Sequence, residues 1–346
     1  VKKYNEGDSV SKYMKEWNTL YNIESYAESG TDINAFEGGF NGKETASFPY
    51  DLTALSAENG GFDLLKVTPY GNSIVADFAI AAIDGEDLGK DNITDVLAVS
   101  FSSTDYIGHN FGANSKEVQD TYLRLDQDLK RLFDALDSKV GKGEYTVFLT
   151  ADHGAIHVPA YLQSVKIPAS YVNSNADKQK LNNFMFNTYK SLELIENVSN
   201  NQIFLNHAKL KEMNLKLSEV QDAIVNEIIR YETVDKAYSG SVFTTTDFTT
   251  GVEELLQNGY NQKRSGDIVF VYNPATISYS KTGSTHGSGL NYDTHTPLLF
   301  FGKGINKGSS YQKTKIVDIA PTMSALLGIS FPNGNTGNPI EMVLKN

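Results

Sequence analysis

Two apolar runs of strand length flank an amphipathic helix, and this order constrains the fold more than any other feature of the chain. The first run, residues 95–103, is apolar on consecutive positions rather than alternating, which is typical of a parallel strand covered on both faces. Residues 118–136 carry one apolar helical stripe, preceded by a capping box at Asn114 and Glu117. A second strand of the same type follows at residues 145–150. Together these segments predict a β-α-β unit with parallel strands and a right-handed crossover.

Further helix-like and strand-like segments extend this alternation along the chain. Apolar residues recur at helical spacing over residues 72–83 and 317–327, and buried strands are expected at residues 267–272 and 297–301. The alternation predicts an α/β fold with a central, largely parallel sheet flanked by helices.

Residues 159–263 differ in character from the rest of the chain. They are rich in Asn and Lys, and their clearest helical pattern lies at residues 217–231. We interpret this stretch as an inserted subdomain within one domain of residues 1–346. The residues before about position 59 show little periodicity, so we expect loops with short helices there.

Composition excludes several classes of function. The chain has 346 residues and a net charge of −12, which argues against nucleic acid or an anionic membrane surface as a general partner. No stretch is apolar for long enough to insert into a membrane. The chain contains no cysteine, so any zinc must be held by His and carboxylate ligands, as in catalytic zinc sites.

Two Asp–His clusters follow the two strands of the predicted β-α-β unit. Asp105 and His109 come after the first strand, four residues apart across a turn that contains Gly108, and Asp152 and His153 come after the second. Ligands of open parallel sheets bind at the carboxyl ends of the strands, so these side chains are expected to lie close together. Carboxylate oxygen and imidazole nitrogen are ligands that suit Zn²⁺, and the sequence therefore predicts a zinc site.

A third imidazole for this site has two candidates, His286 and His295, which both precede the strand at residues 297–301. We favour His286 because the Gly and Ser residues around it leave space for a metal and a substrate. Each of these residues also has a plain structural interpretation, since Asp at a strand end often caps a helix or forms a turn. We interpret His207 as structural, and His157 either as structural or as a support for a ligand.

These motifs together resemble the alkaline phosphatase superfamily, and more narrowly its monomeric, broad-specificity zinc alkaline phosphatases of Gram-negative periplasms. The segments that carry the resemblance are residues 101–109, 150–154, 258–267, 286–288 with 292–295, and 317–322. The resemblance implies an alkaline-phosphatase-like sandwich with an inserted subdomain. It also implies a monomeric protein that is periplasmic or secreted and acts on small-molecule phosphate esters.

The resemblance assigns roles to the candidate ligands. Asp105, His109 and His286 would hold one zinc ion. Asp152 and His153 would contribute to a second, so that a complete site holds two Zn²⁺. The implied reaction is hydrolysis of phosphate monoesters by in-line phosphoryl transfer through a phospho-enzyme.

The chain departs from the family pattern at its N-terminus. The resemblance covers about the C-terminal two-thirds of a complete member, and the family's Thr or Ser nucleophile belongs to an N-terminal segment that precedes it. The chain begins without Met and without a signal-peptide pattern, so we expect a trimmed chain or a fragment. Ser103, Thr104 and Thr285 are near the ligands but lack the nucleophile's context, so no catalytic residue is assigned.

Three interpretations of function therefore stay open. The first is a phosphomonoesterase, of which this chain alone is expected to be inactive or weakly active. The second is a phosphodiesterase or nucleotide pyrophosphatase of the same superfamily. The third is a non-catalytic protein that retains zinc ligands without a nucleophile.

Overall fold

The computed structural model describes residues 2–344, in which helices alternate with short strands. The α-helices are α1 (Lys2–Glu6), α2 (Leu52–Leu55), α3 (Pro69–Gly85), α4 (Ser103–Phe111), α5 (Lys116–Leu136), α6 (Pro159–Ser164), α7 (Ser174–Tyr189), α8 (His207–Glu212), α9 (Leu217–Ile228), α10 (Val242–Thr245), α11 (Gly251–Gly259), α12 (Asn291–Thr294), α13 (Ile319–Leu327) and α14 (Glu341–Leu344). The strands are β1 (Glu16–Trp17), β2 (Tyr50–Asp51), β3 (Thr146–Thr150), β4 (Ser170–Tyr171), β5 (Ile195–Ser199), β6 (Gln202–Leu205), β7 (Val234–Ser239), β8 (Ile268–Tyr272), β9 (Thr276–Ile277) and β10 (Leu298–Gly302). The short 3₁₀ or π turns are η1 (Ser11–Tyr13), η2 (Ile23–Ser25), η3 (Ser56–Glu58), η4 (Gly61–Val67), η5 (Asp137–Gly141) and η6 (Ile316–Asp318).

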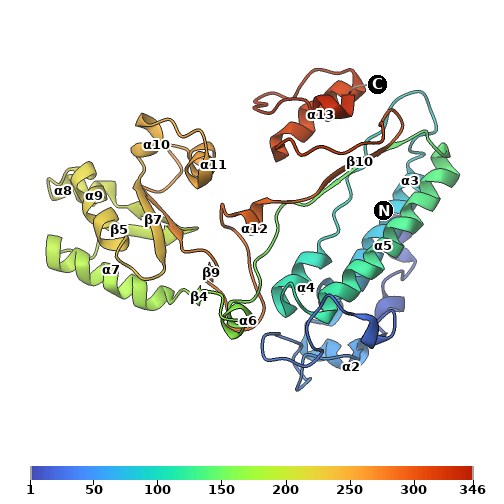
Figure 1. Cartoon of the computed structure of the whole chain (residues 1–346), viewed down its shortest axis with the longest axis horizontal. Helices are drawn as coiled ribbons and strands as arrows, with labels where there is room; N and C mark the ends of the chain where they lie inside the picture. The colour runs from blue at the N-terminus through green and yellow to red at the C-terminus, as the bar shows by residue number, and fades with distance from the viewer. Residues whose placement is uncertain (1, 345–346) are drawn as a thin grey trace.

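The chain is arranged as two units with connecting strands between them (Figure 1). The N-terminal unit, residues 2–136, contains the long helices α3 and α5, which pack against each other. The lobe, residues 174–272, contains the sheet β5-β6-β8-β7 with helices α7 to α11. The pairs β3–β10 and β4–β9 and the helices α6 and α12 lie between these two units. No helix within residues 2–344 has both the length and the apolar character needed to cross a bilayer.

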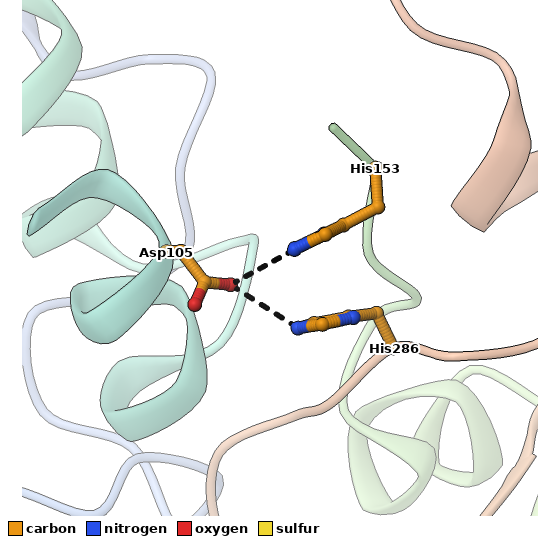
Figure 2. A group of neighbouring side chains, drawn as sticks. All are labelled: Asp105, His153 and His286. Carbon is orange, nitrogen blue, oxygen red and sulfur yellow. Dashed lines mark ion pairs between the residues drawn. The ribbon is translucent and has the colours of Figure 1, made fainter. Parts of the chain in front are cut away.

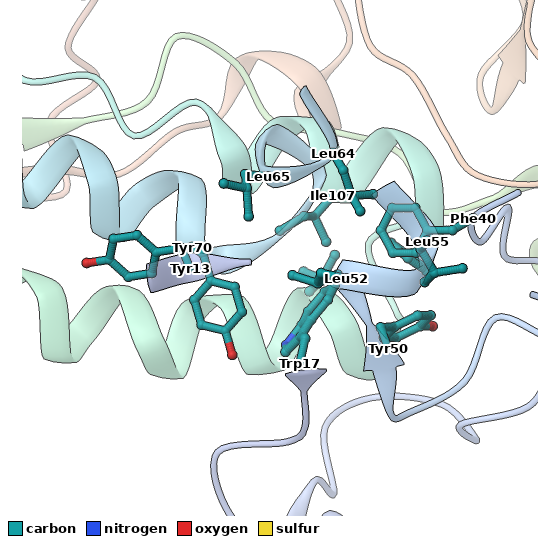
Figure 3. Close-up of a cluster of buried hydrophobic side chains, with 12 residues drawn as sticks. Tyr13, Trp17, Phe40, Tyr50, Leu52, Leu55, Leu64, Leu65, Tyr70 and Ile107 are labelled. Carbon is teal, nitrogen blue, oxygen red and sulfur yellow. The ribbon is translucent and has the colours of Figure 1, made fainter. Parts of the chain in front are cut away.

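An aromatic core holds the N-terminal unit together (Figure 3). Trp17 and Tyr50 are fully buried, and they pack with Phe111 and Ile107 of α4. The indole Nε1 of Trp17 donates a 2.7 Å hydrogen bond to Oδ2 of Asp120 on α5. Aromatic side chains bury large apolar areas, so this cluster fixes α4 firmly against α5. The opposite face of α4 is thereby left free to present polar side chains.

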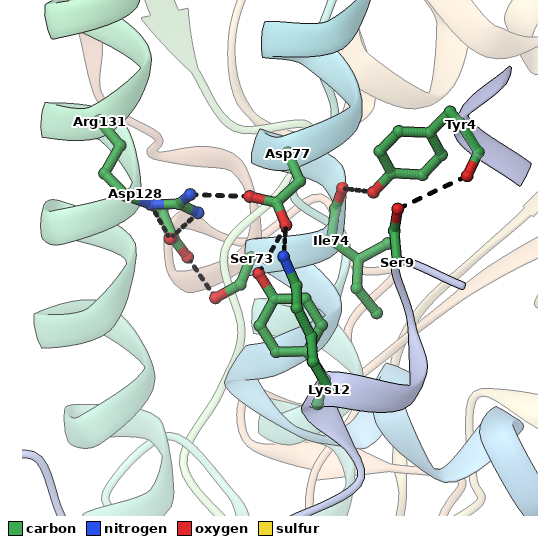
Figure 4. A network of polar contacts seen from close by, with 9 residues as sticks. Tyr4, Ser9, Lys12, Ser73, Ile74, Asp77, Asp128 and Arg131 are labelled. Carbon is green, nitrogen blue, oxygen red and sulfur yellow. Dashed lines mark hydrogen bonds and ion pairs between the residues drawn. The ribbon is translucent and has the colours of Figure 1, made fainter. Parts of the chain in front are cut away.

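A polar network on the other side of the N-terminal unit ties the first residues to α3 and α5 (Figure 4). Asp77 of α3 accepts 2.7 Å hydrogen bonds from Arg131 of α5 and from Lys12, and a third from the Tyr13 hydroxyl. Burial opposes ionisation of Asp77, but the hydrogen bonds from its two basic neighbours and from Tyr13 outweigh it and lower the pKa of this carboxyl. The network therefore braces three separate segments around one carboxylate.

The predicted β-α-β unit is confirmed only in part. The helix is α5 and the second strand is β3, but residues 95–101 form no strand pairing within the described chain, and Val96 is 67 % exposed. β3 instead pairs antiparallel with β10, in a register that sets Leu298 opposite Thr150. An apolar run predicts burial, but it does not identify the neighbouring strand that must supply the hydrogen bonds. The helix cap also differs, because Ser115 accepts from the Val118 amide where Asn114 was expected to begin the helix.

The lobe accounts for most of the Asn-rich and Lys-rich stretch. Its sheet is antiparallel, and β8, expected in the central sheet, is the strand of this sheet that lies between β6 and β7. Its core includes Ile224, Leu194 and Met185, which are almost completely buried. Among the strand pairings of residues 2–344, only that of β4 with β9 is parallel. The expectation of a largely parallel sheet is therefore wrong for the strands of residues 2–344. We propose that the lobe is the inserted subdomain, with β8 included in it.

Candidate metal centre

Helix α4 carries the first pair of predicted ligands. Asp105 and His109 lie on a helix rather than across the expected turn, and the same four-residue spacing places them on one face. Nε2 of His109 lies 3.4 Å from Oδ2 of Asp105. Nδ1 of His109 lies 2.8 Å from the Ser284 carbonyl oxygen. A carbonyl only accepts, so Nδ1 donates this bond, which orients the ring and leaves Nε2 as the atom available to a metal.

The loop after β3 carries the second pair. Nδ1 of His153 donates to the Gly154 carbonyl at 2.9 Å, which again leaves Nε2 as the free ring nitrogen. This Nε2 lies 3.9 Å from Oδ1 of Asp105 and 3.6 Å from Oδ2 of Asp152. The Asp152 side chain is 90 % exposed, whereas the His153 side chain is mostly covered. His153 therefore points toward Asp105, with Asp152 at its outer side.

His286 completes the convergence on Asp105 (Figure 2). Its Nε2 lies 3.5 Å from the same Oδ1 of Asp105. The rings of His153 and His286 stack with centroids 3.3 Å apart and an interplanar angle of 15°. One ligand atom from each of the three residues lies within 4.8 Å of the others. Two imidazole nitrogens and a carboxylate oxygen are a donor set that suits Zn²⁺, so the residues present fit this metal.

The electrostatics of the cluster favour a bound cation. Burial lowers the pKa of His286, and the neighbouring His153 lowers it further, so this imidazole is neutral at neutral pH, as a metal ligand must be. The hydrogen bond with Asp105 raises the pKa of His109. Burial opposes ionisation of Asp105, but the hydrogen bond from His109 and the charges of His109, His286 and His153 together outweigh it and lower the pKa of the carboxyl. A metal competes with a proton for His109, and its affinity is expected to rise with pH.

The other histidines lie apart from this cluster. His295 is exposed and is not a member of the three-residue group, which favours His286 as the third imidazole. Nε2 of His207 is 2.8 Å from Oδ1 of Asp267 in the lobe, in agreement with a structural role. His157 is exposed and packs its ring near Tyr161. The five-residue ligand set remains a prediction.

Sequence reasoning assigned no role to Asp293, although it lies in the motif around residues 292–295. Its carboxylate is buried and accepts hydrogen bonds from the backbone just after His286. The available signal was its position between His286 and His295. An Asp in such a loop also matches an ordinary turn, so its role could not be assigned from the sequence.

The α/β fold and the converging Asp and His side chains agree with the comparisons with known proteins, which place the chain in the alkaline phosphatase superfamily. More narrowly, the chain belongs to the type I phosphodiesterase / nucleotide pyrophosphatase family, whose model matches residues 11–297. The family resemblance inferred from the motifs is therefore confirmed.

Individual relatives agree with this assignment. The chain is 42 % identical to alkaline phosphatase PafA of Elizabethkingia meningoseptica, over 95 % of this chain and 60 % of the relative. It is 40 % identical to a protein of Myroides odoratus named calcium-transporting ATPase, over 100 % of this chain and 64 % of the relative. A crystal structure of wild-type PafA superposes with a TM-score of 0.93 at 40 % identity, covering 100 % of this chain and 66 % of that one. The predicted α/β class is thus confirmed, and the chain spans less than two-thirds of the length of these relatives.

Proposed function

We propose that the complete protein is a zinc-dependent phosphomonoesterase. In this proposal Asp105, His109 and His286 hold one zinc ion, and Asp152 and His153 contribute to a second. The observation that carries it is the approach of two imidazole Nε2 atoms, at 3.5 and 3.9 Å, to one oxygen of Asp105. The relative PafA, named an alkaline phosphatase, supports the choice of reaction.

Zinc would supply the positive charge that binds and polarises phosphate oxygens. This matters for a chain of net charge −12, which otherwise attracts an anionic ester poorly. The protein's own part is to fix the rings before the metal arrives. The carbonyls of Ser284 and Gly154 accept from the Nδ1 atoms of His109 and His153, and so hold both Nε2 atoms on the Asp105 side.

Two of the hydroxyl groups near the ligands are poorly placed to act as a nucleophile. Ser103 is buried, and Oγ1 of Thr104 accepts a 3.1 Å hydrogen bond from the Asn72 side chain. We therefore propose that the Thr or Ser nucleophile of the phospho-enzyme belongs to the part of a complete family member that this chain does not cover. The proposals of a monomeric protein and of a periplasmic or secreted location rest on the family resemblance alone.

A second candidate function is cleavage of phosphodiesters or of nucleotide pyrophosphates. It is favoured by the description of the family whose model matches residues 11–297. The same zinc ligands serve either reaction, so the substrate decides between them. A higher kcat/KM for p-nitrophenyl phosphate than for bis(p-nitrophenyl) phosphate supports the monoesterase, and the reverse order supports the diesterase.

The activity test compares this chain with a hybrid in which it is joined to the part of PafA that it does not cover. With zinc added, we expect the hybrid to hydrolyse p-nitrophenyl phosphate and the chain alone to show little turnover. Efficient hydrolysis by the chain alone, abolished by Thr104→Ala, would place the nucleophile within it. A hybrid that binds zinc but hydrolyses neither ester would indicate a non-catalytic zinc protein.

The ligand test uses chelator competition to measure zinc affinity. His286→Ala is expected to weaken zinc binding by more than about tenfold, because it removes one of the converging nitrogens. His295→Ala is the matched control and is expected to leave the affinity unchanged, since His295 lies outside the cluster. A large loss in His295→Ala and none in His286→Ala would mean that the third imidazole has been wrongly chosen.

A further inference from the structure

Asp293 is a buried carboxylate that holds the loop after His286. Its side chain is 4 % exposed, and it lies in the short helix α12. Its Oδ2 accepts hydrogen bonds from the Gly287 amide at 3.1 Å, the Ser288 amide at 2.8 Å and the Ser288 hydroxyl at 2.7 Å. Three donors on one charged oxygen form a strong, directional anchor. The two residues that follow His286 are thereby fixed in place.

The main chain of Asp293 holds a second loop at the same time. Its carbonyl oxygen accepts a 2.7 Å hydrogen bond from the amide of Gly154. A Cβ at Gly154 would lie 2.2 Å from the Tyr292 carbonyl oxygen, so the two backbones touch and only glycine fits there. The loop that carries His153 is therefore pressed directly against the segment of Asp293.

Both anchored loops carry candidate zinc ligands next to the anchor points. His286 directly precedes Gly287, and His153 directly precedes Gly154. Their rings stack face to face near Asp105 (Figure 2), although the residues are far apart in the sequence. Within residues 2–344, Asp293 is the link between these loops that combines a buried charge with main-chain bonding. Its Oδ1 has no hydrogen-bond partner in this range, so the anchor uses only one of the two carboxylate oxygens.

We propose that Asp293 is a positioning residue that sets the separation and orientation of His153 and His286 before zinc binds. The inference rests on the proposed zinc site and deepens it. A metal gains affinity when its ligands are already held in place, because less conformational freedom is lost on binding. Loss of a group that orients a metal ligand typically weakens metal affinity by roughly 10- to 100-fold.

The test measures zinc affinity of this chain by chelator competition, together with its unfolding temperature without metal. Asp293→Ala removes all three acceptor contacts and is expected to weaken zinc binding by roughly 10- to 100-fold. Asp293→Asn keeps a carbonyl oxygen for the same donors, with its amide group at the position of the unpartnered Oδ1. Asp293→Asn is expected to retain most of the zinc affinity. If Asp293→Ala lost affinity only because it unfolds, the Asn variant would not be expected to restore it in this way.

Asp267→Ala supplies the matched control. Like Asp293, Asp267 accepts a hydrogen bond from a backbone amide, that of Leu205, through its carboxylate. Its carbonyl oxygen also accepts a hydrogen bond from the amide of a glycine, Gly240. It lies in the lobe, so its loss is expected to leave zinc affinity unchanged. Unchanged affinity in a folded Asp293→Ala variant would overturn the inference.

A variant with a milder change keeps the test decisive if Asp293→Ala does not fold. Ser288→Ala removes one of the three donors and is expected to weaken zinc binding a few-fold and to shift the visible spectrum of the Co²⁺-loaded chain. An unchanged affinity and spectrum would overturn the inference. If the unaltered chain itself binds no zinc, the proposed metal centre fails instead, so the two failures are distinguishable.

Discussion

Glu37 and Glu117 are buried carboxyl groups in the N-terminal unit. Each has an Oε2 atom with no hydrogen-bond partner in the described part of the chain. Oε1 of Glu37 accepts from Asn34, and Oε1 of Glu117 accepts from the Tyr50 hydroxyl. Burial raises the pKa of both carboxyls, and their mutual repulsion raises that of Glu37 further. The folded protein therefore favours the form of this pair that carries a proton.

This pair predicts that the protein loses stability as the pH rises. A group whose folded pKa lies above its unfolded value stabilises the fold fully at acidic pH, and this contribution disappears as the pH rises through the folded pKa. Glu37→Gln stays neutral and keeps the acceptor for Asn34. We expect it to raise the unfolding temperature at pH 9 and to change it little at pH 5, measured by circular dichroism. The exposed Glu44→Gln serves as the control, and an equal effect of both changes at pH 9 would contradict the prediction.

At the residue scale, the sequence predicted which side chains lie close together. Asp105, His153 and His286 were selected from Asp–His and His–Gly patterns at loop positions, and the structure brings them together. Asp293 was overlooked because its role depends on backbone amides of residues 154, 287 and 288. Such contacts are created by the fold and leave no pattern in the residue types.

Helix α4 is the element that brings two of the proposed ligand side chains to the candidate metal centre. Its buried face, with Ile107 and Phe111, packs into the aromatic core, while Asp105 and His109 face the metal centre. Its buried positions, Ser103, Ile107 and Phe111, recur every four residues, which is helical spacing and explains why this segment forms a helix rather than the expected turn. The orientation of both ligands is thus inherited from apolar packing.

A core substitution on this helix should therefore affect the whole unit. Ile107→Ala leaves a cavity in the aromatic core and is expected to lower the free energy of unfolding by about 2–5 kcal/mol. The measurement is urea unfolding followed by Trp17 fluorescence. Tyr106→Ala, on the exposed side of the same helix, is the control and should cost much less. Comparable losses for the two variants would show that α4 is not held by its buried face.

At the element scale, apolar residues at helical spacing identified α3, α5 and α9, and a continuous apolar run identified β3. The same patterns failed for residues 95–101 and for the sheet direction. Strand pairing depends on partners distant in sequence, and no local pattern specifies whether β3 meets a parallel or an antiparallel neighbour.

Across the whole molecule, the β3–β10 pair presents apolar side chains to solvent. Leu299 and Phe301 share one face of β10 and are 59 % and 57 % exposed, and their partners on β3 are Leu149 and Val147. Exposed apolar strands promote association between chains. This chain alone is therefore expected to self-associate as its concentration rises.

Light scattering after size-exclusion chromatography measures this association. Phe301→Lys is expected to shift the chain toward monomer, because it places a charge on the apolar face. Tyr311→Lys is the control, since Tyr311 is fully exposed but lies outside the strand pair. Equal effects of the two substitutions, or a chain that stays monomeric at high concentration, would contradict the prediction.

The register of β3 against β10 also contributes to the geometry of the candidate metal centre. β3 ends immediately before the His153 loop, and β10 begins shortly after the segment of Asp293, so the pairing of Thr150 with Leu298 sets both loops at one end of the ribbon. A slip of one residue would slide one strand by about 3.3 Å and turn its side chains over. This displacement of the strand equals the distance between the ring centroids of His153 and His286. A one-residue insertion within this ribbon would therefore pull the ligands apart, whereas the same insertion in the loop beyond β10 would leave their spacing intact.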